Sequence, residues 1–153
     1  MAPDLLRQTI GKTASFRKTV SESDVYLFAG ITGDFSPNHV DEEFMAATPY
    51  GARIAHGALL VGYMSGCSTD IVAQCGELAT THFPVSLGYD RIRFLHAVTI
   101  GETIELTYTI TACDAEKMRT IAEVEIKTRN AGRCCVATHL LKWLPKPASG
   151  DSR

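Results

Sequence analysis

Apolar and polar residues alternate with a period of two through most of the second half of the chain. Every second residue from Ile104 to Ile110 is apolar, and the apolar residues from Ala122 to Ile126 alternate with charged ones. This alternation is typical of strands with one face on the core and the other in water. The turn signals IGE, CDAEK and NAGR separate such segments. We therefore predict strands over 81–94, 102–111, 119–128 and 134–144, connected as hairpins.

The first half of the chain follows a different pattern. A first strand is predicted over 12–20, and then a short helix over 21–33 that Ser21 and Asp24 cap. Residues 34–55 are rich in Pro, Gly, Asn and Asp and contain a predicted helical turn at 40–48; connections of this length tend to be functional. In 56–75 apolar residues are spread around the helical circumference, which predicts a helix buried on most sides, with other backbone packed against its glycines.

This order of elements predicts an α+β fold. An antiparallel sheet of five strands that curls around one long central helix lets each element bury its apolar face. At 153 residues the chain fits one domain, and no linker or internal repeat divides it. We expect a single domain over 1–144, followed by a loose, polar tail over 145–153.

Composition excludes several classes of protein. A formal net charge of −2 argues against general nucleic-acid binding, which requires a strongly basic face. Five cysteines without CxxC spacing, and an N-terminus that lacks a basic segment followed by an apolar run, predict free structural thiols in the cytoplasm. Polar residues interrupt the 56–75 helix, so no membrane span is expected. The histidines outside 33–57 show no metal-ligand spacing, so no metal site is expected.

The stretch GDFSPNHVDEEF (33–44) brings a carboxylate, Asp34, close in sequence to an imidazole, His39. Pro37 keeps the chain extended or turned between them, so a loop can aim both side chains at one point. An ionised carboxylate and a histidine that titrates near neutral pH can together activate one water molecule. Alternatively, Asp34 caps a turn, and His39 or Asn38 caps the helical turn that follows. The spacing alone leaves both interpretations open.

A second candidate feature is RIAHGALL (53–60), where the predicted central helix begins at or just after His56. Amides in the first turn of a helix have no intrahelical acceptor, and the helix dipole favours negative charge there. Gly57 has no side chain, so an acyl carbonyl can approach its N–H closely, as in an oxyanion hole. Alternatively, Gly57 only lets the loop turn tightly. His56 itself is expected to be a packed, hydrogen-bonded residue.

Taken together, TGDFSPNHVDEEF (32–44) and YGARIAHGALLVGYMSG (50–66) resemble the signature of the MaoC-like (R)-specific enoyl-CoA hydratases. That signature is an Asp-x-Asn-Pro-x-His-x-Asp stretch, then Phe/Tyr-Gly, then Ile-Ala-His-Gly. The resemblance extends from about residue 12 to 144 and includes LGYDRIRFLHAVTIGET (87–103). The chain departs from the signature at Ser36, where many members have asparagine.

The resemblance implies a hot-dog fold with a catalytic loop overhanging the central helix, and an enzyme that adds water to trans-2-enoyl-CoA to give (R)-3-hydroxyacyl-CoA, or the reverse. It implies that Asp34 and His39 bind the water molecule and that the amide of Gly57 donates to the thioester oxygen. Ser65 aligns with a substrate-binding serine of the helix. It also implies a homodimer or higher homo-oligomer and no separate cofactor, because coenzyme A is part of the substrate.

Coenzyme A carries phosphates, for which Arg53, Arg91 and Arg93 are candidate ligands. Two other functions remain open at this stage: a hot-dog acyl-CoA thioesterase and a non-catalytic module that binds acyl thioesters. Release of thiol from saturated acyl-CoA would identify the first. A complete set of Asp34, His39 and Gly57 argues against the second, because a binding module does not need it.

Overall fold

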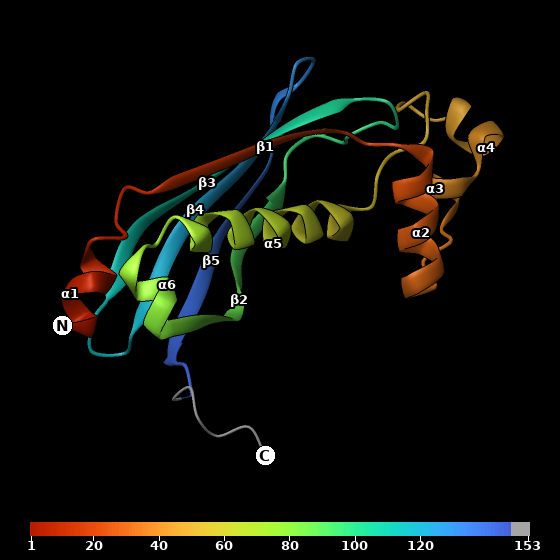
Figure 1. The fold of residues 1–153 in the computed structure, drawn as a ribbon. Coiled ribbons are helices and arrows are strands. Elements are labelled where there is room, and N and C mark those ends of the chain that lie inside the picture. Colours follow the sequence, from red (N-terminus) through yellow and green to blue (C-terminus); the bar gives the residue numbers. More distant parts are fainter. Residues whose placement is uncertain (148–153) are drawn as a thin grey trace.

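The computed structural model describes residues 1–147 (Figure 1). The helices are α1 (Ala2–Arg7), α2 (Glu22–Thr32), α3 (Pro37–Val40), α4 (Glu42–Ala46), α5 (Gly57–Ala73) and α6 (Glu77–Thr81). The strands are β1 (Thr13–Thr19), β2 (His82–Phe94), β3 (Thr103–Asp114), β4 (Arg119–Thr128) and β5 (Gly132–Pro145). All predicted strands and the two longer predicted helices are present, whereas α1 and α6 were not predicted. The hairpins predicted at CDAEK and NAGR are confirmed, but the one predicted at IGE is wrong, because β2 pairs with β5 and not with β3.

The strands form one antiparallel sheet in the order β1-β3-β4-β5-β2, and α5 lies along its concave face (Figure 1). The predicted alternation is confirmed on β3 and β4. Residues Ile104 and Ile110 at the two ends of the β3 stripe are fully buried, and so is Ile126 on β4, whereas the neighbouring Glu123 is exposed. The apolar stripes of the strands therefore face α5 and form the core with it.

The central helix buries only one face against the sheet. Its buried residues recur at helical spacing, from Leu59 and Leu60 through Met64 and Cys67 to Ile71. The opposite face is exposed, and a Cβ added at Gly62 or Gly66 would meet no atom within 4 Å. The predictions of a helix buried on most sides and of backbone packed against these glycines are therefore wrong for this chain, because one five-stranded sheet covers only one side of a helix.

The five cysteines are free; four are buried and Cys113 is partly buried. Burial raises the pKa of Cys67 and of Cys135 to about 11, which makes both thiols poor nucleophiles at neutral pH. The prediction of free thiols that act as small hydrophobic side chains is confirmed.

A histidine is buried between α5 and the sheet. His139 of β5 is 1% exposed and stacks on the ring of Tyr89. Its Nε2 forms a hydrogen bond with Ser86 Oγ (2.8 Å) and its Nδ1 one with Tyr108 Oη (2.9 Å). Burial lowers its pKa from 6.5 to about 4, because the charged form loses its hydration. His139 is therefore neutral in the folded protein at neutral pH.

This burial predicts that stability falls in mild acid. The unfolded chain binds the His139 proton more readily than the folded chain, so the contribution of His139 is complete above its unfolded pKa and is lost as the pH falls from about 6.5 towards 4. We expect about 2 kcal/mol less stability from this residue at pH 5 than at pH 7.5. Urea titrations at pH 7.5 and pH 5 measure this loss in the free energy of unfolding. The loss should be smaller by that amount in His139→Gln than in the wild type, whereas His96→Gln, at an exposed position, should show the wild-type loss. Parallel pH profiles for wild type and His139→Gln would contradict the prediction.

Three short helices form an overhang at the N-terminal end of α5, which we define as α2, α3 and α4 with their connections (Figure 1). The predicted cap of α2 is confirmed: Asp24 N donates to Ser21 Oγ at 3.3 Å, and Ser21 N donates to Asp24 Oδ2 at 2.8 Å. The cap of α4 is Asp41, which accepts from Phe44 N at 2.9 Å, and neither Asn38 nor His39 has that role. Residues 33–41, which connect α2 to α4 and include α3, lie in this overhang above the start of the central helix.

At the C-terminus, Pro145 pairs with His82 in the sheet, and Lys146 N donates to Thr81 O at 2.9 Å. The rest of the predicted tail, 148–153, lies outside the described residues, and the division into a domain over 1–144 and a tail over 145–153 stays a prediction. Within residues 1–147, no helix combines the length and the apolar character that crossing a membrane requires.

Candidate active site

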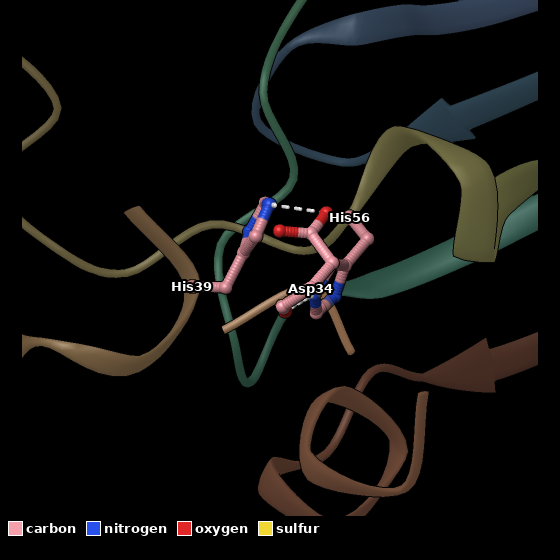
Figure 2. A group of neighbouring side chains, drawn as sticks. All are labelled: Asp34, His39 and His56. Carbon is pink, nitrogen blue, oxygen red and sulfur yellow. Dashed lines mark hydrogen bonds and ion pairs between the residues drawn. The ribbon is translucent and has the colours of Figure 1, made fainter. Parts of the chain in front are cut away.

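The overhang brings Asp34 and His39 together, as the loop interpretation predicted (Figure 2). His39 Nε2 and Asp34 Oδ2 are 3.9 Å apart; the His39 side chain is 8% exposed and that of Asp34 50% exposed. This separation is too long for a hydrogen bond and short enough for one water molecule to contact both atoms. The turn-capping alternative also holds in part, because Asp34 Oδ1 accepts from Ser36 N at 3.3 Å.

Backbone contacts define which nitrogen of His39 carries the proton. His39 Nδ1 lies 2.8 Å from the carbonyl oxygen of Ile54, which can only accept, so Nδ1 is the donor. In the neutral ring, Nε2 then holds a lone pair. The Nδ2 amide of Asn38 is 3.3 Å from this nitrogen and can donate to it. His39 therefore presents a proton acceptor on the side where the Asp34 carboxylate lies.

His56 fixes the backbone of the loop that carries Asp34 rather than presenting a reactive group. The residue is 1% exposed, and its Nε2 donates to the carbonyl oxygen of Asp34 at 2.9 Å. Its ring stacks on His39 with centroids 3.7 Å apart and also packs against Phe28. The prediction of a packed, hydrogen-bonded His56 is confirmed. What the sequence did not indicate is its target, the main chain of Asp34.

Gly57 is the first residue of α5, so its amide lies where the helix dipole favours a negative oxygen. Gly57 and His39 line the same cavity, of about 400 Å³, together with Tyr50, Phe94 and other residues of the segments 38–60 and 94–98. A Cβ at Gly57 would lie 2.7 Å from Phe94 Cζ, so the absence of a side chain matters here. Phe94 was not predicted as a site residue, since nothing in the local pattern placed it over the helix start.

Of the predicted site residues, only His39 and Gly57 line this cavity, and Asp34 lies beside it, facing His39. Ser65 is exposed on the free face of α5, eight residues from Gly57 and so about 12 Å along the helix. Arg91 is exposed at an irregularity of β2, with a φ of +53°. The guanidinium of Arg53 lies in the overhang between Glu22 and Glu42.

Three potential metal donors gather at the site: one ligand atom each from Asp34, His39 and His56, all within 4.8 Å of one another. His56 Nε2 is already bonded to Asp34 O, and the stacked His39 and His56 rings have an interplanar angle of 28°. Lone pairs in the planes of two stacked rings run side by side and do not converge on one ion. The geometry therefore suits a hydrogen-bonded water better than a metal ion, and the expectation of no metal site stays a prediction.

These observations define a class of protein: a hot-dog fold with an Asp–His pair and a helix N-terminus at its overhang. The chain belongs to the MaoC-like domain family, whose model, described as "MaoC like domain", matches residues 6–131.

Among its relatives, the (R)-specific enoyl-CoA hydratase of Rhodospirillum rubrum is 36% identical over 107 residues, which are 70% of this chain and 69% of that protein. The 3-hydroxybutyryl-CoA dehydratase of Methylorubrum extorquens is 33% identical over 110 residues, 72% of this chain and 65% of that protein. The solved structure of an (R)-hydratase from A. caviae involved in PHA biosynthesis has a TM-score of 0.76 at 25% identity, covering 87% of this chain and 95% of that one. The hot-dog fold implied by the resemblance is confirmed.

Proposed function

We propose that this chain is a lyase that adds water reversibly to a trans-2-enoyl thioester and gives the (R)-3-hydroxyacyl thioester. The observation that carries the proposal is the pair formed by His39 Nε2 and Asp34 Oδ2, 3.9 Å apart and beside the cavity that the start of α5 lines. The names of the two relatives, a hydratase and a dehydratase, describe the two directions of this reaction.

In the proposed mechanism, Asp34 and His39 hold one water molecule. The water oxygen bonds to C3 of the enoyl group while His39 Nε2 accepts the proton that the water loses. The electron pair of the C2–C3 double bond moves towards the thioester carbonyl. C2 then takes a proton from the imidazolium of His39, which returns the ring to its neutral form, so that one water is added overall. The Ile54 carbonyl, 2.8 Å from His39 Nδ1, stabilises the imidazolium that forms, and the Asp34 carboxylate faces it.

In this mechanism the amide N–H of Gly57 donates a hydrogen bond to the thioester oxygen and stabilises the negative charge that develops there. Preorganised amides at a helix N-terminus stabilise such an oxyanion, and losing one donor typically costs about 10²–10³-fold in rate. The chemistry requires no separate cofactor, because every proton and bond comes from water, substrate and side chains.

Assays with crotonyl-CoA test the proposal. Loss of the conjugated enoyl thioester and formation of (R)-3-hydroxybutyryl-CoA support it; formation of the (S) product contradicts the stereochemical part. Thiol release without hydration would identify the thioesterase, and binding of the thioester without turnover would identify the non-catalytic module. Substrates of C4, C8 and branched chains then define which acyl groups the cavity accepts.

Gly57→Ala should lower kcat by about tenfold to hundredfold, because its Cβ and the Phe94 ring cannot both occupy their present places next to the amide. Phe94 is 54% exposed, so its ring can move away and the variant should still fold. The double variant Gly57→Ala, Phe94→Ala should recover part of the lost rate in the same assay. Full activity of Gly57→Ala would show that the substrate does not approach this amide closely.

For substrate binding, we propose that the exposed Arg91 contacts a phosphate of coenzyme A, and that Ser65 contacts the substrate on the free side of α5. The αL backbone of Arg91 at a bulge supports its role, because bulges re-aim side chains and such strain concentrates at functional sites. The guanidinium of Arg53 is matched by two carboxylates, which would repel a phosphate there.

We propose further that the chain acts as a homodimer in the cytoplasm. β2 is an edge strand of the sheet and carries Phe83, Val85 and Leu87, each 39–48% exposed. Exposed apolar edge strands invite pairing with another chain, and symmetric homodimers are the commonest oligomers of soluble proteins. A second copy that also covers the free face of α5 would place Ser65 in an enclosed channel. The mass of the protein in solution tests the dimer.

A further inference from the structure

One cationic side chain connects two helices of the overhang to the segment before α5. Arg53 is 12% exposed in its side chain; its Nε donates to Glu42 Oε2 at 2.6 Å and its Nη1 to Glu22 Oε2 at 3.3 Å. Its Nη2 donates to Glu22 Oε1. Glu22 is the first residue of α2 and Glu42 the first of α4. The hydrogen bonds to Glu22 and then to Glu42 raise the pKa of Arg53, so the charge is permanent.

The backbone next to this guanidinium holds the catalytic histidine. Ile54 N donates to Asn38 O at 3.0 Å, and Ile54 O accepts from His39 Nδ1 at 2.8 Å. On the other side, Ala55 N donates to Val98 O at 2.7 Å, so this segment is also attached to the loop that precedes β3. Segment 53–55 thus lies between the overhang and the body of the fold, and its position determines where the Ile54 carbonyl meets His39.

We propose that Arg53 is a positioning residue: by binding Glu22 and Glu42 at once, it fixes segment 53–55 against α2 and α4 and so holds His39 with Nδ1 protonated and Nε2 unprotonated. This inference rests on the proposed hydration and replaces the phosphate-binding role that the sequence suggested for Arg53. Only a guanidinium can bind one carboxylate with two nitrogens and another with its third nitrogen. A lysine, with one nitrogen, can keep the charge but cannot hold both helices in this geometry.

Steady-state kinetics of Arg53→Gln and Arg53→Lys on two substrates test the positioning role. One substrate is crotonyl-CoA and the other is the N-acetylcysteamine thioester of crotonate, which has no phosphate. We expect kcat to fall by about tenfold to hundredfold in Arg53→Gln with both substrates, because small misplacements of a catalytic group cost rate, and KM for crotonyl-CoA to stay within about twofold. Arg53→Lys should recover only part of the loss.

Two variants serve as controls. Arg17→Gln breaks an ion pair with Glu105 outside the overhang and should leave both kinetic constants unchanged. The double variant Glu22→Gln, Glu42→Gln keeps Arg53 and removes its partners, so it should show the same loss of kcat as Arg53→Gln. A higher KM for crotonyl-CoA alone, with kcat unchanged and the phosphate-free substrate unaffected, would overturn the proposal in favour of phosphate binding. Unchanged kinetics in Arg53→Gln would overturn it as well.

The imidazole ¹⁵N shifts of His39 give a readout that does not depend on turnover. We expect one tautomer, protonated at Nδ1, in the wild type, and a mixture of tautomers in Arg53→Gln. An unchanged single tautomer in a folded Arg53→Gln would contradict the positioning role even if the rate had fallen. If the wild type hydrates no thioester, the proposed function fails, whereas these shifts still decide whether Arg53 orients His39.

Discussion

Asp34→Asn is expected to lower kcat for crotonyl-CoA hydration by about 10²–10⁴-fold, with KM within about twofold. Asparagine has the size of aspartate, and its side-chain oxygen can still accept from Ser36 N, so the turn persists. The carbonyl oxygen of Asp34 that binds His56 belongs to the main chain and is unchanged. The loss therefore reports the missing negative charge, which is proposed to hold the water molecule and to face the imidazolium of His39.

Two measurements separate this effect from a folding defect. The Asp34→Asn protein should melt within a few degrees of the wild type, because the Asp34 side chain is half exposed. Glu43→Gln, which removes an exposed carboxylate from the same overhang, should keep wild-type kinetics. Turnover by Asp34→Asn close to that of the wild type would remove this carboxylate from the mechanism.

His39→Asn is expected to cause a loss of similar size, about 10²–10⁴-fold in kcat. The amide nitrogen of asparagine falls near the position of imidazole Nδ1 and can still donate to the Ile54 carbonyl. What the variant lacks is Nε2, the proposed proton acceptor. His39→Ala would instead remove the donor to that carbonyl, so asparagine is the sharper test.

Single-turnover rates with crotonyl-CoA measure this loss directly, and His82→Asn at the far end of β2 is the matched control. Because Asp34 and His39 are proposed to act on one water molecule, the double variant should fall little below the slower single variant. Losses that multiply in the double variant would indicate separate roles. A kcat for His39→Asn above a tenth of the wild-type value would exclude Nε2 as the proton acceptor.

Local patterns predicted most of the fold. The alternation in β3 and β4 gave their inward faces correctly, because the side-chain period of a strand follows from its backbone geometry. The Ser21–Asp24 capping box gave the start of α2 for the same kind of reason. α1 and α6 were missed, since each spans only one or two turns and short helices depend on packing more than on their own sequence.

The site was predicted less completely. The sequence indicated Asp34, His39 and Gly57, whereas the support around them came from parts of the chain that carry no motif for it: the Ile54 carbonyl, the stacked ring of His56 and the ring of Phe94. Backbone carbonyls have no sequence signature. Arg53 was assigned to a phosphate, because nothing in its neighbourhood along the chain placed Glu22 and Glu42 beside it.

The sequence by itself determined the strands, the long helix and the residue types available for proton transfer, because hydrophobic period, capping and the chemical type of a side chain are local properties. The tertiary structure decided which groups meet. The 3.9 Å separation of Asp34 and His39 and the tautomer of His39 depend on α3, on segment 53–55 and on the loop before β3 being held together. These segments are brought close only by burial of the sheet and helix faces, so their mutual distances cannot be derived from spacing along the chain.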